Sequence, residues 1–171
     1  AANYQTAVGY QALLSSQSGG YNTAVGNNAM NVTTTGQENV AMGNGALYNC
    51  NGSYNTCIGT NAGDAITSGE KNTGIGYVAL SGVTTGENNS ACGRYAGYDI
   101  TTGSNNACFG NHAGRSASPS GAITTGSNII CLGDNSISDL YCADTSISSS
   151  DARDKTDVED FKYGLSWITE L

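Results

Sequence analysis

The chain has little charge and few apolar residues for its length. Of its 171 residues, 12% are charged and 38% are hydrophobic, with one Pro, one Trp and one His. Soluble globular domains usually carry about 25% charged and about 45–50% apolar residues. The composition therefore argues against an ordinary globular domain with one thick core.

Each further absence excludes a class of protein or site. No run of about 18 apolar residues exists, so the sequence predicts no membrane insertion. Gly does not recur at every third position, which excludes a collagen triple helix. Six Lys and Arg against 14 Asp and Glu give a net charge of −8, which is unsuited to binding the nucleic-acid backbone. With one His and no C-x-x-C among six Cys, we expect no metal and no cofactor.

What the sequence has in abundance is a repeat. Eight copies align on a Gly that follows an apolar residue, with successive spacings of 17, 17, 16, 17, 17, 17 and 23 residues. The aligned glycines, called here the marker glycines, are Gly9, Gly26, Gly43, Gly59, Gly76, Gly93, Gly110 and Gly133. Ala, Gly or Cys precedes the apolar residue, and Asn stands four positions before the Gly in six copies. Self-similarity at a fixed period is the signature of a solenoid.

The repeat unit favours strands over helices. Segments such as Asn22 to Val25 alternate large and small residues, as short strands do, and no copy holds the ten or more periodic residues of a packed helix. We therefore predict an all-β fold, a parallel β-solenoid of about eight 17-residue coils over residues 1–149, with two strands and two Gly corners per coil. At roughly 4.8 Å per coil the rod would be on the order of 40 Å long. The repeated Asn is expected to form a hydrogen-bonded ladder.

The two faces of the strand lead to a prediction about assembly. We expect the large residues, such as Val8, Val25, Ile58 and Ile75, to fill the coil, and the Ala, Gly and Cys face to point outward. A face that stays small in every copy suggests close approach to another backbone. Identical chains around a three-fold axis would explain it, and a flat coil that packs on itself is the alternative.

Residues that often carry chemistry fall within the repeat. Cys57, Cys108 and Cys131 take the small position and Cys92 the apolar one, so we expect buried small hydrophobes. A disulfide between Cys108 and Cys131 is the alternative, since both share a register on neighbouring coils. Six extra residues in the seventh copy, around Pro119, are expected to form a surface loop.

One His and several Tyr residues are candidates for binding. His112 lies in a column of mixed residues, which predicts a solvent-facing side chain. An aromatic strip for sugars could be built from Tyr10, Tyr77, Tyr95 and Tyr98. Because these tyrosines fall in different columns of the repeat, simple surface cover is the favoured interpretation.

The unit N-T-A-V-G-x-x-A resembles the head repeats of trimeric autotransporter adhesins and, more closely, the shafts of bacteriophage tail fibres. In both families such units build a left-handed β-roll that assembles as a homotrimer. The resemblance covers residues 3 to about 135. It implies architecture rather than a ligand, because a fold does not name its function.

Composition changes near residue 150. Residues 1–149 hold 8 acidic and 3 basic side chains, whereas residues 150–171 hold 6 and 3. In the second segment Phe161, Leu165, Ile168 and Leu171 recur at helical spacing, and Asp157 suits an N-cap. The sequence therefore predicts a second domain from 150 to 171 that contains a short C-terminal helical segment.

The junction, S-S-D-A-R-D-K-T-D-V, resembles the start of the intramolecular chaperone domain at the end of phage tail fibres and tailspikes. In that family the domain trimerises the fibre, assists its folding and then cuts itself off. The resemblance implies that Ser150 is the nucleophile, that Lys155 is the base, and that the cut falls between Ser149 and Ser150. The supporting motif residues are Asp151, Arg153 and Asp157.

One departure from the family bears on that chemistry. Asp154 precedes Lys155, where the family commonly has Leu. A carboxylate there favours the charged form of the lysine and weakens it as a base. An uncleaved member of the family is therefore the alternative.

Together the resemblances imply a structural virion protein, the shaft of a trimeric tail fibre that takes part in host attachment. The expected partners are identical chains, other tail proteins and a host cell-surface receptor, with glycans as a candidate class. The expected location is the virion, assembled in the host cytoplasm, and no enzymatic activity is expected beyond one self-cleavage. The alternative is the head of a trimeric adhesin on a bacterial surface.

Overall fold

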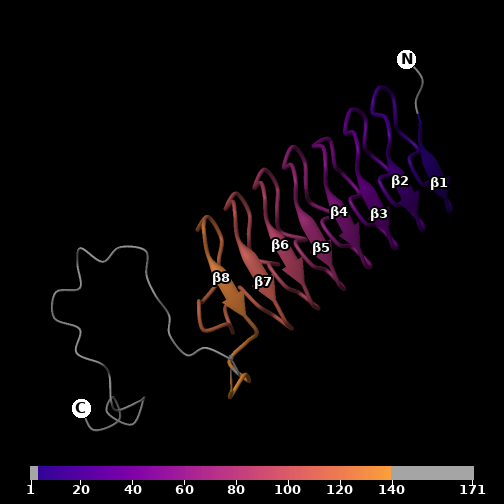
Figure 1. Ribbon diagram of the computed structural model, residues 1–171. Helices are drawn as coiled ribbons and strands as arrows, with labels where there is room; N and C mark the ends of the chain where they lie inside the picture. The colour runs from indigo at the N-terminus through magenta and orange to yellow at the C-terminus, as the bar shows by residue number, and fades with distance from the viewer. Residues whose placement is uncertain (1–3, 140–171) are drawn as a thin grey trace, which may run out of the picture. The chain divides into compact units, whose positions relative to one another are not determined.

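The computed structural model describes residues 4–139. Within this range the chain forms eight three-residue strands and no helix. They are β1 Thr6–Val8, β2 Thr23–Val25, β3 Val40–Met42, β4 Thr56–Ile58, β5 Thr73–Ile75, β6 Ser90–Cys92, β7 Ala107–Phe109 and β8 Ile130–Leu132. They form one parallel sheet in sequence order, stacked side by side (Figure 1). The predicted all-β, parallel β-solenoid with a repeat of about 17 residues is confirmed.

The register of the sheet is the register of the repeat. Neighbouring strands pair small residue to small residue, as in Ala24 with Ala41. Cys108 still pairs with Cys131 across the 23-residue step. The extra residues of that copy are absorbed in turns, where Pro119 is exposed, as predicted for an insertion.

Each coil contains one strand rather than the predicted two. Turns make up the rest of the coil, and besides the marker glycine at least three positions in each turn region carry positive φ, as at Val78 (59°), Leu80 (54°) and Asn88 (57°) between β5 and β6. Such left-handed residues interrupt extended backbone. Their N–H groups bond the neighbouring coil instead: Val78 donates to the carbonyl of Thr60 at 2.9 Å, and Leu80 to that of Ala96 at 3.0 Å.

The interior of the coil is lined by the small strand residue, so the predicted facing is wrong. The middle residue is buried in every strand from β2 to β8. Val8, Ile58 and Ile75 are exposed instead, at 56%, 37% and 41%, and Val25 is half-buried.

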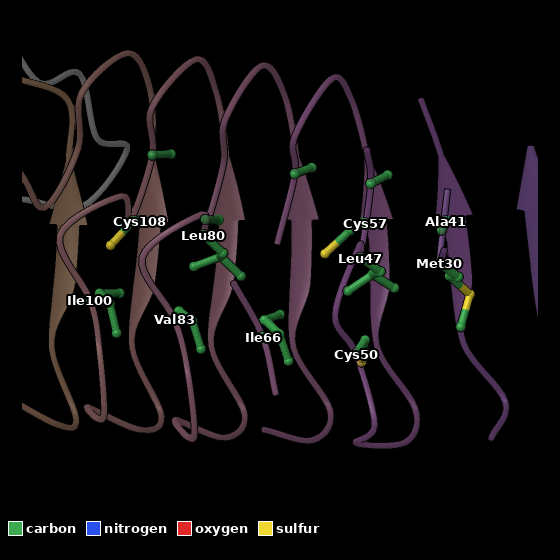
Figure 2. Packing of buried hydrophobic residues seen from close by; sticks show 14 of the residues in the cluster. Met30, Ala41, Leu47, Cys50, Cys57, Ile66, Leu80, Val83, Ile100 and Cys108 are labelled. Atoms are coloured by element: carbon green, nitrogen blue, oxygen red, sulfur yellow. The ribbon is translucent and has the colours of Figure 1, made fainter. Parts of the chain in front are cut away.

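The reason is that the turns supply the large core side chains. The largest fully buried apolar residues are Met30, Leu47, Ile66, Leu80, Val83 and Ile100. Figure 2 shows them lying between the two walls of the coil, next to Ala41, Cys57 and Cys108. With these side chains inside, the strand wall has room only for Ala, Gly or Cys.

The predicted Asn ladder is present. The buried Asn72 donates from Nδ2 to Oδ1 of Asn55 at 3.1 Å and to the carbonyl of Gly86 at 2.9 Å. Its Oδ1 accepts from the backbone N–H and the Nδ2 of Asn89 at 3.0 and 3.1 Å. One side-chain bond is missing, at the 16-residue spacing between Asn39 and Asn55, but the backbone N–H of Asn55 still donates to Oδ1 of Asn39 at 2.8 Å.

Candidate functional site

The side chains excluded from the interior form an apolar column on the outer face of the sheet. Its members are the third residues of the strands: Val8, Val25, Met42, Ile58, Ile75, Cys92, Phe109 and Leu132. They are paired in register from one strand to the next. Single exposed apolar residues are ordinary on a protein surface, whereas a continuous file marks an interaction site.

The borders of the apolar column are uncharged. A marker glycine follows each member, and Thr or Ser stands two residues before most of them, as in β5 and β6. None of the eight strands contains a charged residue. The column can therefore approach another surface without desolvating a charge.

A second exposed feature lies in the turns that follow β5, β6 and β7. Tyr95 is at its centre, with the ring centroids of Tyr77 and Tyr98 at 5.4 and 5.7 Å in edge-on arrangements. The Cζ atoms of Arg94 and Arg115 lie 4.6 and 5.0 Å from the centroid of the Tyr95 ring. Both distances fall in the range of cation–π contacts.

Polar contacts hold the two guanidinium groups in place. Nη1 of Arg94 lies 3.2 Å from Nε2 of His112, whose ring packs edge-on against Tyr95 with centroids 5.2 Å apart. Nε of Arg115 lies 3.9 Å from Oδ1 of Asp99 and is buried without a hydrogen-bond partner. We call Tyr77, Arg94, Tyr95, Tyr98, His112 and Arg115 the aromatic–cationic patch.

The patch joins residues that the repeat alignment separates. Tyr77, Tyr95 and Tyr98 belong to three columns and His112 was expected to face solvent, yet His112 is half-buried against Tyr95. The second residue after the marker glycine is left-handed, with φ of 57° at Tyr95 and 58° at His112. This bend folds the turn back and brings the three columns together. Tyr10 shares the repeat position of Tyr77 but belongs to the first coil, and it forms no ring contact with the others.

The cysteines are free thiols in the part of the chain that is described, and no disulfide joins Cys108 to Cys131. Burial raises the pKa of Cys50 to about 12 and that of Cys108 to about 11. Burial also raises the pKa of Cys57. Thiols held protonated are poor nucleophiles and ligands. The expected burial is confirmed for Cys57, Cys108 and Cys131 but is wrong for Cys92, which is exposed on the apolar column.

Neither a cluster of metal ligands nor a membrane-spanning helix is present in residues 4–139. No group of three or more His, Cys, Asp or Glu side chains is placed to hold a metal ion. The described residues also contain no helix that is long and apolar enough to cross a membrane.

The residues of the predicted self-cleavage site lie outside the described residues. They are Ser149, Ser150, Asp151, Arg153, Lys155 and Asp157. The predicted helical segment from Phe161 to Leu171 lies outside them as well. Both stay predictions from the sequence.

Comparison of the chain with protein-family models, with curated protein sequences and with solved structures gives no match.

Proposed function

We propose that the chain is the shaft of a homotrimeric bacteriophage tail fibre, a structural virion component that takes part in host attachment. The observation that supports this is the apolar column, which follows the outer face of a parallel solenoid through all eight strands. A monomer would leave that column in water, at a cost of about 25 cal/mol per Å² of apolar surface.

The partner that fits the column is another copy of the same chain. The column presents one side chain per coil, so a partner must present its own side chains at the same spacing along the whole sheet. An identical chain has that spacing because it has the same coils. One column per chain suits packing around a common axis, because cyclic symmetry buries the same surface of every copy. The glycine that follows each column residue lets the backbones approach closely.

We prefer a tail fibre to other trimeric proteins because of the sequence at the junction near residue 150. In this proposal the second domain is an intramolecular chaperone. Lys155 takes the hydroxyl proton of Ser150 as its oxygen bonds to the carbonyl carbon of Ser149, the C–N bond breaks with the proton passed to the leaving amine, and water hydrolyses the resulting ester. The rival, a trimeric adhesin head on a bacterial surface, would share the column. An adhesin gene would continue beyond residue 171 into a coiled-coil stalk and membrane anchor, and a fibre gene into the rest of a chaperone domain.

Mass measurement of the purified chain tests the assembly. We expect three chains per particle for the wild type and dissociation for Ile75→Asp, which places a carboxylate in the column. Thr85→Asp, at an exposed turn position, is the matched control and should remain trimeric. A stable wild-type monomer would end the proposal.

Expression of the full-length gene with Ser150→Ala tests the self-cleavage separately. We expect one long band on a gel for the variant and two shorter ones for the wild type. Identical bands would remove the cleavage step and leave the trimeric shaft in place.

A further inference from the structure

We infer that the aromatic–cationic patch binds a saccharide that carries a carboxylate, as a glycan contact on the side of the shaft. The inference rests on the proposed role in host attachment and names the ligand class. It uses side chains that neither the solenoid core nor the apolar column requires.

The patch interrupts the repeat at a position where most other coils hold small polar residues. One position after the marker glycine, Tyr77 and Arg94 stand where coils such as the second, third and fourth have Asn27, Asn44 and Thr60, and only the first coil also has a tyrosine, Tyr10. In a chain whose backbone geometry repeats, a local change of side chains with no change of fold indicates a function of the surface.

Positive charge is concentrated at the patch. Residues 4–139 contain three Lys or Arg side chains, Lys71, Arg94 and Arg115, and two of them belong to it. On a chain of net charge −8, this is where an anionic group finds hydrogen-bond donors. Guanidinium groups bind carboxylates through paired N–H donors.

Both arginines are positioned before any ligand arrives. Arg94 is held between the ring of Tyr95 and Nε2 of His112, and Arg115 lies over the rings of Tyr95 and Tyr98, with its Cζ 5.0 and 4.8 Å from their centroids. Side chains that are already ordered lose little conformational entropy on binding.

The neighbouring acidic groups favour a sugar over a polyanion. Asp99 lies beside Arg115, and Asp134 interacts electrostatically with His112. These carboxylates would repel a dense row of phosphates, but they accept hydrogen bonds from hydroxyl groups. A ligand with several hydroxyls and one carboxylate matches this set of donors and acceptors. Tyr77, at 48% exposed, offers a ring face for the apolar side of a sugar.

Calorimetric titration of the full chain can test the inference. The probe is a tetrasaccharide that alternates glucuronic acid with N-acetylglucosamine, and the comparison is the neutral tetramer of N-acetylglucosamine. We expect binding of the acidic probe, at least about tenfold weaker binding of the neutral one, and about tenfold loss for Arg94→Ala, as for a lost charge-assisted hydrogen bond. Tyr77→Ala should also weaken binding, by about fivefold or more for a lost ring contact.

The control variant is Tyr10→Ala, which removes the Tyr at the same repeat position in the first coil, outside the patch. It should bind like the wild type. Equal binding by wild type and Arg94→Ala, equal affinity for the acidic and neutral tetramers, or inorganic phosphate binding as tightly as the acidic tetramer would each overturn the inference. Mass measurement on the same samples separates the two proposals: a trimer that does not bind rejects only the glycan site, and a monomer rejects the trimeric fibre.

Discussion

Removing one rung of the Asn ladder should cost far more stability than an ordinary polar substitution. Asn72→Ala deletes two hydrogen bonds donated by Nδ2, to Asn55 and Gly86, and two accepted by Oδ1, both from Asn89. A typical buried hydrogen bond contributes about 1 kcal/mol net to folding. The four together give about 4 kcal/mol, and the orphaned backbone N–H of Asn89 makes this a lower bound.

Urea unfolding at a fixed chain concentration measures the effect. With a denaturant slope of about 2–3 kcal/mol per M, a loss of about 4 kcal/mol lowers the midpoint by about 1.5 M. The matched control is Asn105→Ala, which removes one exposed bond, 2.7 Å long, from Nδ2 to Oδ1 of Asn128. Asn105 has left-handed backbone, with φ of 57°, so Ala there costs up to about 1 kcal/mol, and the control midpoint should fall by no more than about 0.4 M.

The comparison of the two Asn variants tests whether the ladder stabilises the stack. If Asn72→Ala shifts the midpoint no more than Asn105→Ala, the side-chain bonds contribute nothing beyond what water supplies. The stability of the rod would then come from the backbone bonds between coils and from the apolar interior. If only the coil around Asn72 loosens, hydrogen exchange will show faster exchange there than at the ends of the sheet, because each coil contacts only its neighbours.

Two further substitutions test the stacking geometry and the buried thiols. Gly59→Ala should cost about 3 kcal/mol by urea unfolding, because φ is 138° and a Cβ would lie 2.6 Å from the carbonyl carbon of Gly76. Gly121→Ala, with positive φ but nothing within 4 Å of a Cβ, should cost about 1 kcal/mol; equal losses would refute the clash. Because burial raises the pKa of Cys57 from 9.0, folding stability should fall above pH 9, by up to about 1.4 kcal/mol per pH unit, as the unfolded thiol ionises. Cys57→Ala should remove only the share of the alkaline slope that comes from Cys57, because the buried Cys50 and Cys108 contribute shares of their own, and Cys92→Ala should leave the slope unchanged; equal slopes for wild type and Cys57→Ala would contradict the assignment.

The architecture could be predicted because the repeat carries it. A 17-residue period with the same Asn and Gly in every copy requires equivalent environments for those residues, and only stacked coils supply them. Asn22, Asn39, Asn55, Asn72, Asn89 and Asn106 then lie one above another, which makes the ladder follow from the alignment. The shape of the turns was not predictable in this way, since left-handed backbone at residues such as Val78 and Leu80 has no marker like Gly or Pro.

The aromatic–cationic patch was missed for the same reason. Alignment columns show which residues are equivalent, not which columns are neighbours across a turn. Tyr77 and Tyr98 lie 21 positions apart in different columns, and their contacts with Tyr95 depend on its left-handed conformation. The cue available in the sequence was local: two Arg, one His and three Tyr within residues 77–115 of a chain otherwise poor in charge.

The inward face of the strand was readable from positions that the alignment left unused. Strand alternation defines two faces but not which one is buried. Within single coils, however, the size of the middle strand residue and the sizes of two turn residues vary together, so that a small residue at one of these positions accompanies a large one at another. The sets are Cys57 with Gly63 and Ile66, Gly74 with Leu80 and Val83, and Ala91 with Gly97 and Ile100.

Such compensation is what a filled interior demands, because close-packed cores tolerate little change in total volume. The contacts agree: a Cβ on Gly97 would lie 2.6 Å from Cδ2 of Leu80 and 3.2 Å from Cδ1 of Ile100. The large strand residues, from Val8 to Leu132, show no such compensation with the turns. Residues that vary without a matching change inside the coil are not constrained by its volume. They belong to the outer face, where an apolar column that continues through all eight strands is the surface that the proposed trimer would bury.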